Sequence, residues 1–88
     1  MERERQWAKL TQGEALRFTR EAAALSQGEL ARRSGLTQST ISAIESGRVG
    51  IGIARAEKLA GALGVHPAVL AFPNWRSYER GRPHRKSA

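Results

Sequence analysis

The sequence of 88 residues predicts an all-α fold, and two observations support this class. The first is a pair of short helical patterns between residues 27 and 46, separated by Gly35. The second is a set of helix start and stop signals elsewhere, such as Thr11 with Glu14, and Gly64. Between these signals, apolar residues recur at spacings of three and four, the period of one face of an α-helix.

The first helix of the domain begins at a capping signal. Thr11 is followed three residues later by Glu14, the spacing of a capping box, in which each residue satisfies the other's free backbone N–H. We therefore expect a helix from about Gln12 to Ala24. The residues expected to face inward are Leu16, Ala23, and either Phe18 or Thr19.

Two further helices lie between residues 27 and 46. Leu30 and Ala31 give the first of them an apolar stripe. Gly35 stands where that helix ends, because glycine enters the left-handed region without a Cβ clash. Thr37 can then cap the second helix, in which Ile41, Ile44 and Glu45 share one face. Two helices joined by so few residues must cross steeply, which is helix-turn-helix geometry.

The outward face of the second of these helices carries small, hydroxyl or amide side chains: Gln38, Ser39, Thr40, Ser42 and Ala43. A helix face that only contacts water usually carries Lys and Glu pairs. Amides and hydroxyls suit the base edges of the DNA major groove, and alanine suits the thymine methyl group. A polar face selected only for solubility remains the alternative interpretation.

The stretch from Leu25 to Arg48 resembles the helix-turn-helix of the lambda-type phage repressor/Cro family, also called the xenobiotic-response-element family. The matching residues are Leu25, Ser26, Gln27, Leu30, Ala31, Ser34, Gly35, Leu36, Thr37, Gln38, Ser39, Thr40, Ile41, Ser42, Ile44, Glu45, Gly47 and Arg48. The likeness extends over about residues 14–72. It implies a five-helix, repressor-like DNA-binding domain that binds operator DNA as a homodimer.

Roles for individual residues follow from this likeness and from the chemistry of the side chains. The residues expected to contact bases are Gln38, Ser39, Ser42 and Ala43. Those expected to contact phosphates, or to brace the base-reading residues, are Gln27, Thr37, Thr40 and Arg48.

The resemblance also implies an ion pair between Arg20 and Glu45. In the family, an arginine at the position of Arg20 pairs with a glutamate at the position of Glu45, near the end of the second helix of the helix-turn-helix. Such a pair explains why a charge lies on the same helix face as Ile41 and Ile44. The alternative is a solvent-exposed Glu45 at the helix end.

The second half of the domain has a loop and two more helices. Where the family commonly has proline and serine, the loop has Ile51 and Gly52, so it is expected to be less rigid. The fourth helix is expected over Ile53–Leu63, with Ile53, Ala56, Leu59, Ala60 and Leu63 on one stripe. A fifth, short helix opens at His66 and Pro67, and Val69, Leu70 and Phe72 are expected to close the core.

The positive charge lies mostly outside the expected domain of residues 11–75. The net charge is +7, of which residues 76–88 carry five bases and one acid. That segment has the composition of a disordered basic tail, which either adds sequence-independent affinity for DNA or only aids solubility. Residues 1–10 are expected to form an N-terminal arm, either disordered or adding a turn of helix that packs Trp7 on the core.

A second copy of the chain needs a surface to dock on. Ile51, Phe72 and Trp75 are large apolar residues near glycine or proline, and Ile51 and Trp75 are not required by the apolar stripes. They are the expected dimer interface, and packing within one chain is the alternative.

Composition limits the function classes. The chain has no cysteine and two histidines, so neither disulfides nor a metal site are expected. No catalytic set of side chains is visible, and we expect neither an enzyme nor a cofactor. No apolar stretch is long enough for a membrane span, so a cytoplasmic protein is expected. The expected partners are double-stranded DNA and a second copy. The alternative function is an antitoxin that binds a toxin protein and regulates its own operon.

Overall fold

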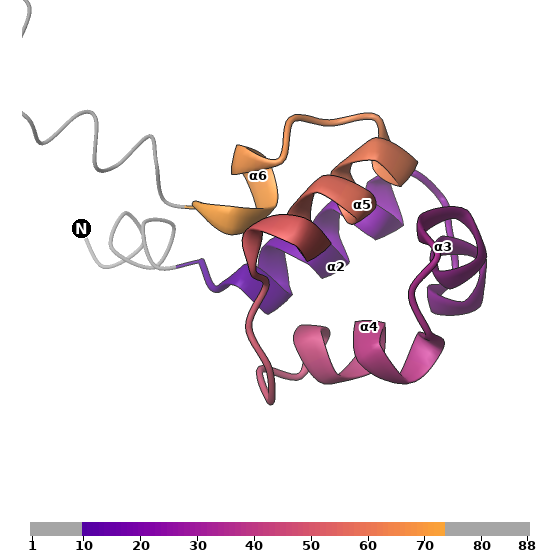
Figure 1. Cartoon of the computed structure of the whole chain (residues 1–88), viewed down its shortest axis with the longest axis horizontal. Coiled ribbons are helices and arrows are strands. Elements are labelled where there is room, and N and C mark those ends of the chain that lie inside the picture. The colour runs from indigo at the N-terminus through magenta and orange to yellow at the C-terminus, as the bar shows by residue number, and fades with distance from the viewer. Residues whose placement is uncertain (1–9, 74–88) are drawn as a thin grey trace, which may run out of the picture.

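The computed structural model describes residues 10–73, which form five α-helices and no strand (Figure 1). The helices are α2 (Gln12–Ala22), α3 (Gln27–Ser34), α4 (Gln38–Glu45), α5 (Ile53–Leu63) and α6 (Ala68–Ala71). The predicted all-α class and the helix-turn-helix, here α3 and α4, are confirmed. Residues 1–9 of the N-terminal arm lie outside the described residues, and so do Trp75 and the basic tail.

Each helix contributes to one apolar core. α2 packs against α4 and α6, α3 packs against α4 and α5, and α5 packs against α6. The largest fully buried side chains are Leu16 from α2, Leu30 from α3, Ile41 and Ile44 from α4, Leu59 from α5 and Leu70 from α6. α4 lies at the edge of the bundle opposite α6 (Figure 1). Because Ile41 and Ile44 face the core, the polar residues Gln38 and Ser39 are left exposed.

Gly13 sets how closely α2 approaches the end of α4. A Cβ added at this position would lie 2.4 Å from the carbonyl oxygen of Ile44, a distance that real Cβ atoms do not adopt. Any larger side chain would therefore push the two helices apart. This contact between backbones fixes α4 against α2, two turns of helix before Arg20.

The first helix ends two residues earlier than predicted. Ala24 has a φ of +59°, in the left-handed region, and so cannot continue the helix. The Ala24 N–H donates to Glu21 O and the Leu25 N–H donates to Arg20 O, at 2.9 and 3.2 Å. These two bonds form a Schellman motif in which alanine occupies the position usually held by glycine.

Among the residues of α2 that were predicted to face inward, Leu16 is buried, whereas Ala23 and the alternative Phe18 are exposed. Phe18 is 53% exposed. It follows buried Leu16 by two residues, about 200° around a helix with 3.6 residues per turn. The face of Leu16 continues instead through Thr19 and Arg20, which are half-buried. Of the two predicted alternatives, Thr19 therefore faces inward rather than Phe18, and the charged Arg20 lies beside it on that face.

Two other predicted core residues are on the surface: Ile53 is 68% exposed and Phe72 is 61% exposed. Ile53 is the first residue of α5, and helical side chains lean toward the N-terminus, so this one extends beyond the helix end. Phe72 follows buried Leu70 by two residues and caps the four-residue α6, so it points away from the core. Within residues 10–73, no helix is long and apolar enough to cross a membrane.

Candidate nucleic-acid interface

The start of α4 is built by a threonine cap. The Thr37 Oγ1 accepts a hydrogen bond from the Thr40 N–H at 3.1 Å, and the two hydroxyls are 2.9 Å apart. Thr37 therefore acts as the predicted N-cap, and Thr40 braces it. Gln38 and Ser39, at the first turn, are exposed to solvent. This arrangement leaves the N-terminal end of α4 accessible to a partner.

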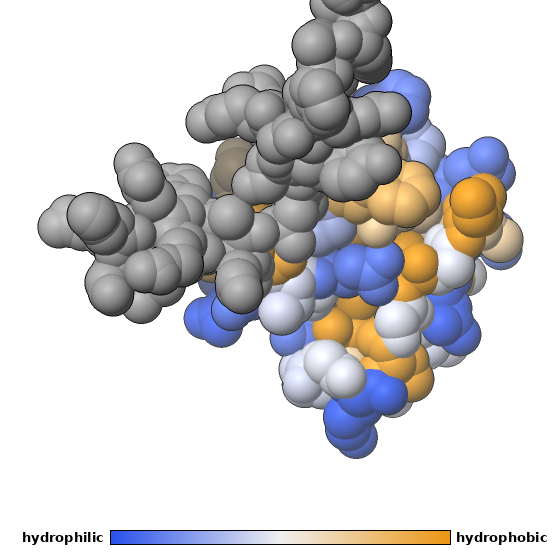
Figure 2. Space-filling view, turned by 90° about the vertical axis from the view of Figure 1, so that its left-hand side faces the viewer, coloured by the Kyte–Doolittle hydropathy of each residue, from blue (hydrophilic) through white to orange (hydrophobic). Residues whose placement is uncertain are grey.

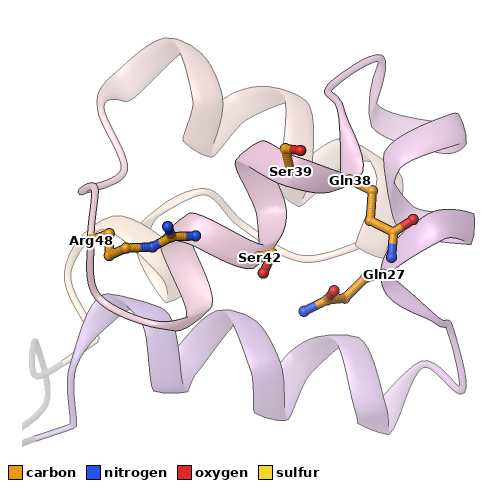
Figure 3. A pocket seen from close by; sticks show the side chains of 5 residues that line it. All are labelled: Gln27, Gln38, Ser39, Ser42 and Arg48. Atoms are coloured by element: carbon orange, nitrogen blue, oxygen red, sulfur yellow. The ribbon is translucent and has the colours of Figure 1, made fainter.

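An open pocket of about 340 Å³ lies along the polar face of α4 (Figure 3). Its lining residues are Gln27, Gln38, Ser39, Ser42 and Arg48. The structure thus brings together three of the four residues predicted to contact bases. Gln27 and Arg48, predicted to contact phosphates or to brace, join them. Ala43, Thr37 and Thr40 belong to the same helix or its cap but do not line this pocket.

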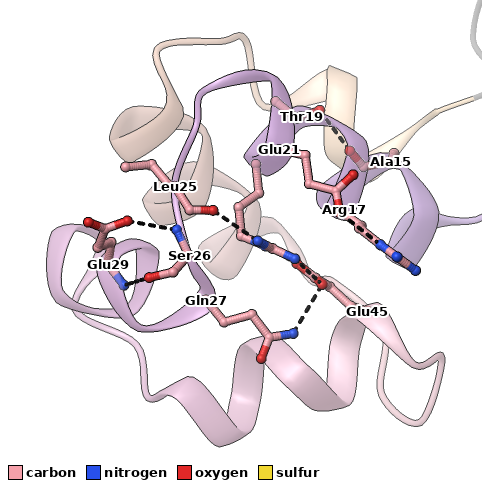
Figure 4. A network of polar contacts seen from close by, with 10 residues as sticks. Ala15, Arg17, Thr19, Glu21, Leu25, Ser26, Gln27, Glu29 and Glu45 are labelled. Atoms are coloured by element: carbon pink, nitrogen blue, oxygen red, sulfur yellow. Dashed lines mark hydrogen bonds and ion pairs between the residues drawn. The ribbon is translucent and has the colours of Figure 1, made fainter.

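Arg20 and Glu45 form the ion pair that the resemblance implied, with two parallel hydrogen bonds (Figure 4). Arg20 Nε lies 2.7 Å from Glu45 Oε2, and Arg20 Nη2 lies 2.9 Å from Glu45 Oε1. The two side chains are 12% and 7% exposed. Arg20 Nη1 also donates to the Leu25 carbonyl at 2.9 Å. The pair therefore joins α2, α4 and the segment that leads into α3.

The protonation of this pair follows from its surroundings. Burial alone would raise the pKa of Glu45, but hydrogen bonds from Arg20 and Gln27, together with the positive charges of Arg20 and Arg17, lower this pKa below its usual value. The hydrogen bond to Glu45 raises the pKa of Arg20. Both groups are consequently charged at neutral pH.

Gln27 belongs both to the ion-pair network and to the pocket. Its Nε2 donates to Glu45 Oε1 at 3.1 Å, while its side chain lines the pocket beside Gln38. The bracing role predicted for Gln27 therefore has a geometric basis. The bond to Glu45, whose side chain is 7% exposed, holds the Gln27 amide at the edge of the pocket.

The end of α4 is closed by a second Schellman motif. Gly47 has a φ of +85°, which glycine adopts without strain. The Gly47 N–H donates to Ile44 O at 3.0 Å and the Arg48 N–H donates to Ala43 O at 2.9 Å. Arg48 Nε donates to Ser46 Oγ at 3.2 Å. Gly47 and Arg48, at the start of the loop, are therefore hydrogen-bonded to the last turn of α4.

Sequence reasoning did not single out Gln12 or Ser46. The Gln12 Oε1 accepts from the Ile51 N–H and its Nε2 donates to the Ala71 carbonyl, both at 2.9 Å. Gln12 thus ties the loop after α4 to the end of α6. The local signal for Ser46 was its place beside Gly47, where a hydroxyl can contact the last turn. Gln12 had no local signal, because its partners are 39 and 59 residues away.

The structure corrects one of the expected dimer residues. Ile51 is 6% exposed and belongs to the core, so it packs within its own chain, which was the alternative interpretation. Phe72 is exposed, and Trp75 lies outside the described residues. Val49 and Ile53 are exposed on either side of Ile51. Figure 2 views the side with α6, the start of α5 and this loop, where apolar groups lie among polar ones.

Comparisons with known proteins agree with this geometry. A family model described as helix-turn-helix matches residues 16–70. The chain belongs to the Cro/C1-type helix-turn-helix family. The predicted family is thereby confirmed, and membership makes this chain a DNA-binding helix-turn-helix protein.

One solved structure is similar over most of its length. It is the crystal structure of a hypothetical transcription factor, NHTF, from Neisseria, with 33% sequence identity and a TM-score of 0.69. The match covers 85% of the present chain and 86% of the other. A search of curated proteins gave no significant match.

Proposed function

We propose that this protein is a sequence-specific transcriptional regulator, a repressor that binds a palindromic operator as a homodimer in the cytoplasm. The observation that carries the proposal is the pocket along α4, where amide, hydroxyl and guanidinium groups converge on a surface left free by the core. Family membership and the likeness to a hypothetical transcription factor support the same function. Repression needs only occupancy of a site that overlaps a promoter.

In the proposed complex, α4 lies in the major groove with its N-terminal residues toward the bases. Gln38 can pair through its amide with adenine, and Ser39 and Ser42 can bond to more than one base. Ala43 meets a thymine methyl group. Thr37, Thr40 and Gln27 hold the end of the helix and approach the phosphate backbone, where contacts fix register.

A second copy is needed because one recognition helix of eight residues reaches few base pairs. A specific site must be distinguished from about a million or more competing sites in a genome. Two chains related by a two-fold axis double the sequence that is read, with half-sites about 34 Å apart. We propose that the two copies meet through Phe72 and Trp75, together with Val49 and Ile53 in place of buried Ile51.

Selection of bound duplexes from a random DNA pool tests the function directly. We expect the selected sites to be palindromic. Gln38→Ala should then cost about 1–3 kcal/mol on the preferred site and relax the choice at one base pair of each half-site. Lys58→Ala, which removes an exposed side chain of α5 outside the pocket, is the matched control.

The decisive quantity is the ratio of affinities for the preferred site and for a scrambled duplex. If Gln38→Ala left that ratio unchanged, α4 would not be the element that reads the sequence. If the wild-type chain enriched no sequence from the pool, sequence-specific binding itself would be refuted.

A further inference from the structure

Arg48 is held more firmly than its place in a glycine-containing loop suggests. Its N–H bonds to Ala43 O at 2.9 Å, so its backbone belongs to the closing turn of α4. Gly47 makes that turn possible through its left-handed φ of +85°. The Cα of Arg48 is therefore positioned by the recognition helix itself.

The side chain is oriented as well. Arg48 Nε donates to Ser46 Oγ at 3.2 Å, and Ser46 Oγ in turn donates to the Ala43 carbonyl at 3.1 Å. Within residues 10–73, the two terminal nitrogens of Arg48 have neither a hydrogen bond nor an ion pair. Figure 3 shows the guanidinium pointing along α4 toward Ser42, on the pocket side.

A phosphate contact does not need this arrangement, since a point charge such as the lysine ammonium group also binds phosphate. A planar fork held at its Nε, with both terminal nitrogens free, matches the O6 and N7 acceptors of guanine in the major groove. The fork also opens into the same pocket as the base-reading candidates Gln38, Ser39 and Ser42. The geometry thus favours base recognition over the phosphate role expected for Arg48 from its place in the loop.

We infer that Arg48 is a specificity-determining residue that reads a guanine in each half-site, with Ser46 as its positioning residue. This inference rests on the proposed DNA-binding function. Gln38 and the Arg48 guanidinium line the same pocket, so the guanine lies in the same half-site as the adenine that Gln38 reads, at a separate base pair.

The first test compares duplexes selected by the wild-type chain and by Arg48→Ala. We expect one guanine position per half-site to lose its preference in the variant, while the position read by Gln38 keeps its own. Affinity for the guanine-containing site should fall roughly 5- to 150-fold, the range of one bidentate base contact. Affinity for a site already changed at that guanine should fall far less.

Salt dependence separates a base contact from a phosphate contact. Each neutralised phosphate adds about 0.9 to the slope of log affinity against log salt concentration. Arg48→Ala should leave that slope unchanged if the side chain contacts a base. Arg33→Ala, which removes an exposed arginine of α3 outside the pocket, controls for the loss of one positive charge.

The second test concerns Ser46, the positioning residue. Ser46→Ala keeps the charge of Arg48 but removes the hydroxyl that holds its Nε, so the guanine preference should weaken several-fold with the salt slope unchanged. Ser46→Thr retains a hydroxyl and should restore the preference. Equal preference in all three proteins would overturn the positioning role.

The outcomes separate a failure of this inference from a failure of the proposed DNA-binding function on which it rests. If Arg48→Ala weakened every duplex equally and lowered the salt slope by about one unit, Arg48 would be a phosphate ligand, while the proposed function would stand. If the wild-type chain selected no sequence, both would fail. Because the side chain of Arg48 is exposed, the variant is expected to fold, and circular dichroism verifies this.

Discussion

At the scale of single residues, the carboxylate of Glu45 connects three parts of the protein. Arg20 reaches it from α2, and Gln27 reaches it from the first residue of α3. Glu45 itself is the last residue of α4. A charge so little exposed is tolerated because Arg20 and Gln27 together donate three hydrogen bonds to its two oxygens. The same bonds tie the C-terminal end of α4 to α2 and to the start of α3.

A double-mutant cycle measures how strongly this pair is coupled. Arg20→Ala and Glu45→Ala should each lower the free energy of unfolding by about 3–5 kcal/mol, because each leaves an unpaired charge in a poorly solvated site. The double variant should lose much less than the sum of the two. Denaturant unfolding of all four proteins supplies the values, and additive losses would show that the two side chains do not interact.

The same carboxylate predicts a pH dependence. The pKa of Glu45 is lowered in the folded chain, so at acidic pH the unfolded chain binds more protons. The stability it contributes is full above the unfolded-state pKa of about 4.5 and is lost as the pH falls through the lower folded-state value.

We therefore expect the difference in unfolding free energy between wild type and Glu45→Gln to shrink as the pH falls below the unfolded-state pKa of Glu45. Denaturant unfolding at pH 7 and at several acidic pH values measures this difference. Glu57→Gln, at an exposed position on α5, controls for the loss of one negative charge. A difference that stayed constant down to pH 2–3, far below the usual carboxyl pKa, would contradict the model.

At the scale of elements, helix ends decide where functional side chains lie. Thr11 and Ser26 each form a complete capping box, and Gly35, Gly47 and Gly64 each end a helix with a positive φ. The end of α2 is different, because Ala24 takes the left-handed position with a φ of +59°. An alanine there has a Cβ that crowds the following carbonyl oxygen.

Ala24→Gly should therefore stabilise the protein by about 1 kcal/mol, as the relief of strain exceeds the added flexibility of the unfolded chain. Ala22→Gly, at the last helical residue of α2, should instead destabilise by about 0.5–1 kcal/mol. Thermal unfolding of both variants checks the opposite signs. A destabilised Ala24→Gly would mean that the left-handed conformation is not strained.

Elements were easier to predict from sequence than the contacts between them. Thr11, Gly35 and Thr37 act locally, so the starts and ends of helices followed from short spacings. The end of α2 was missed because three successive alanines carry no stop signal. The outward positions of Ile53 and Phe72 depend on where α5 begins and where α6 ends, which the spacing of apolar residues does not record. The bridge made by Gln12 depends on partners distant in sequence.

At the scale of the whole molecule, one chain presents a single recognition helix at one edge of its core. The polar face of that helix was predicted from residue types alone, because the apolar residues of α4 had to face inward. The assembly was harder to predict. Ile51 looked dispensable for the core in the sequence, yet it is buried, while its neighbours Val49 and Ile53 are exposed.

The last prediction concerns the dimer on DNA. Ile53→Glu and Phe72→Glu place a charge on exposed apolar positions, so they should abolish cooperative binding to a palindrome and leave the fold intact. Affinity for a single half-site should remain unchanged, because neither residue lines the pocket. Ile51→Glu is unsuitable for this test, since it would put a charge in the core. Ala22→Glu adds the same charge at an exposed position on α2 and serves as the control.

Titrations with a full palindrome and with an isolated half-site, combined with footprinting, measure the effect. Two chains bound to one duplex gain from a shared tether, so even a weak contact between them should raise affinity for the palindrome well above that for two separate half-sites. The footprint should show two protected segments about 34 Å apart on one face of the DNA. If one wild-type chain held a non-palindromic site at full affinity, the dimer would be excluded, and the apolar surface at Ile53 and Phe72 would need another explanation.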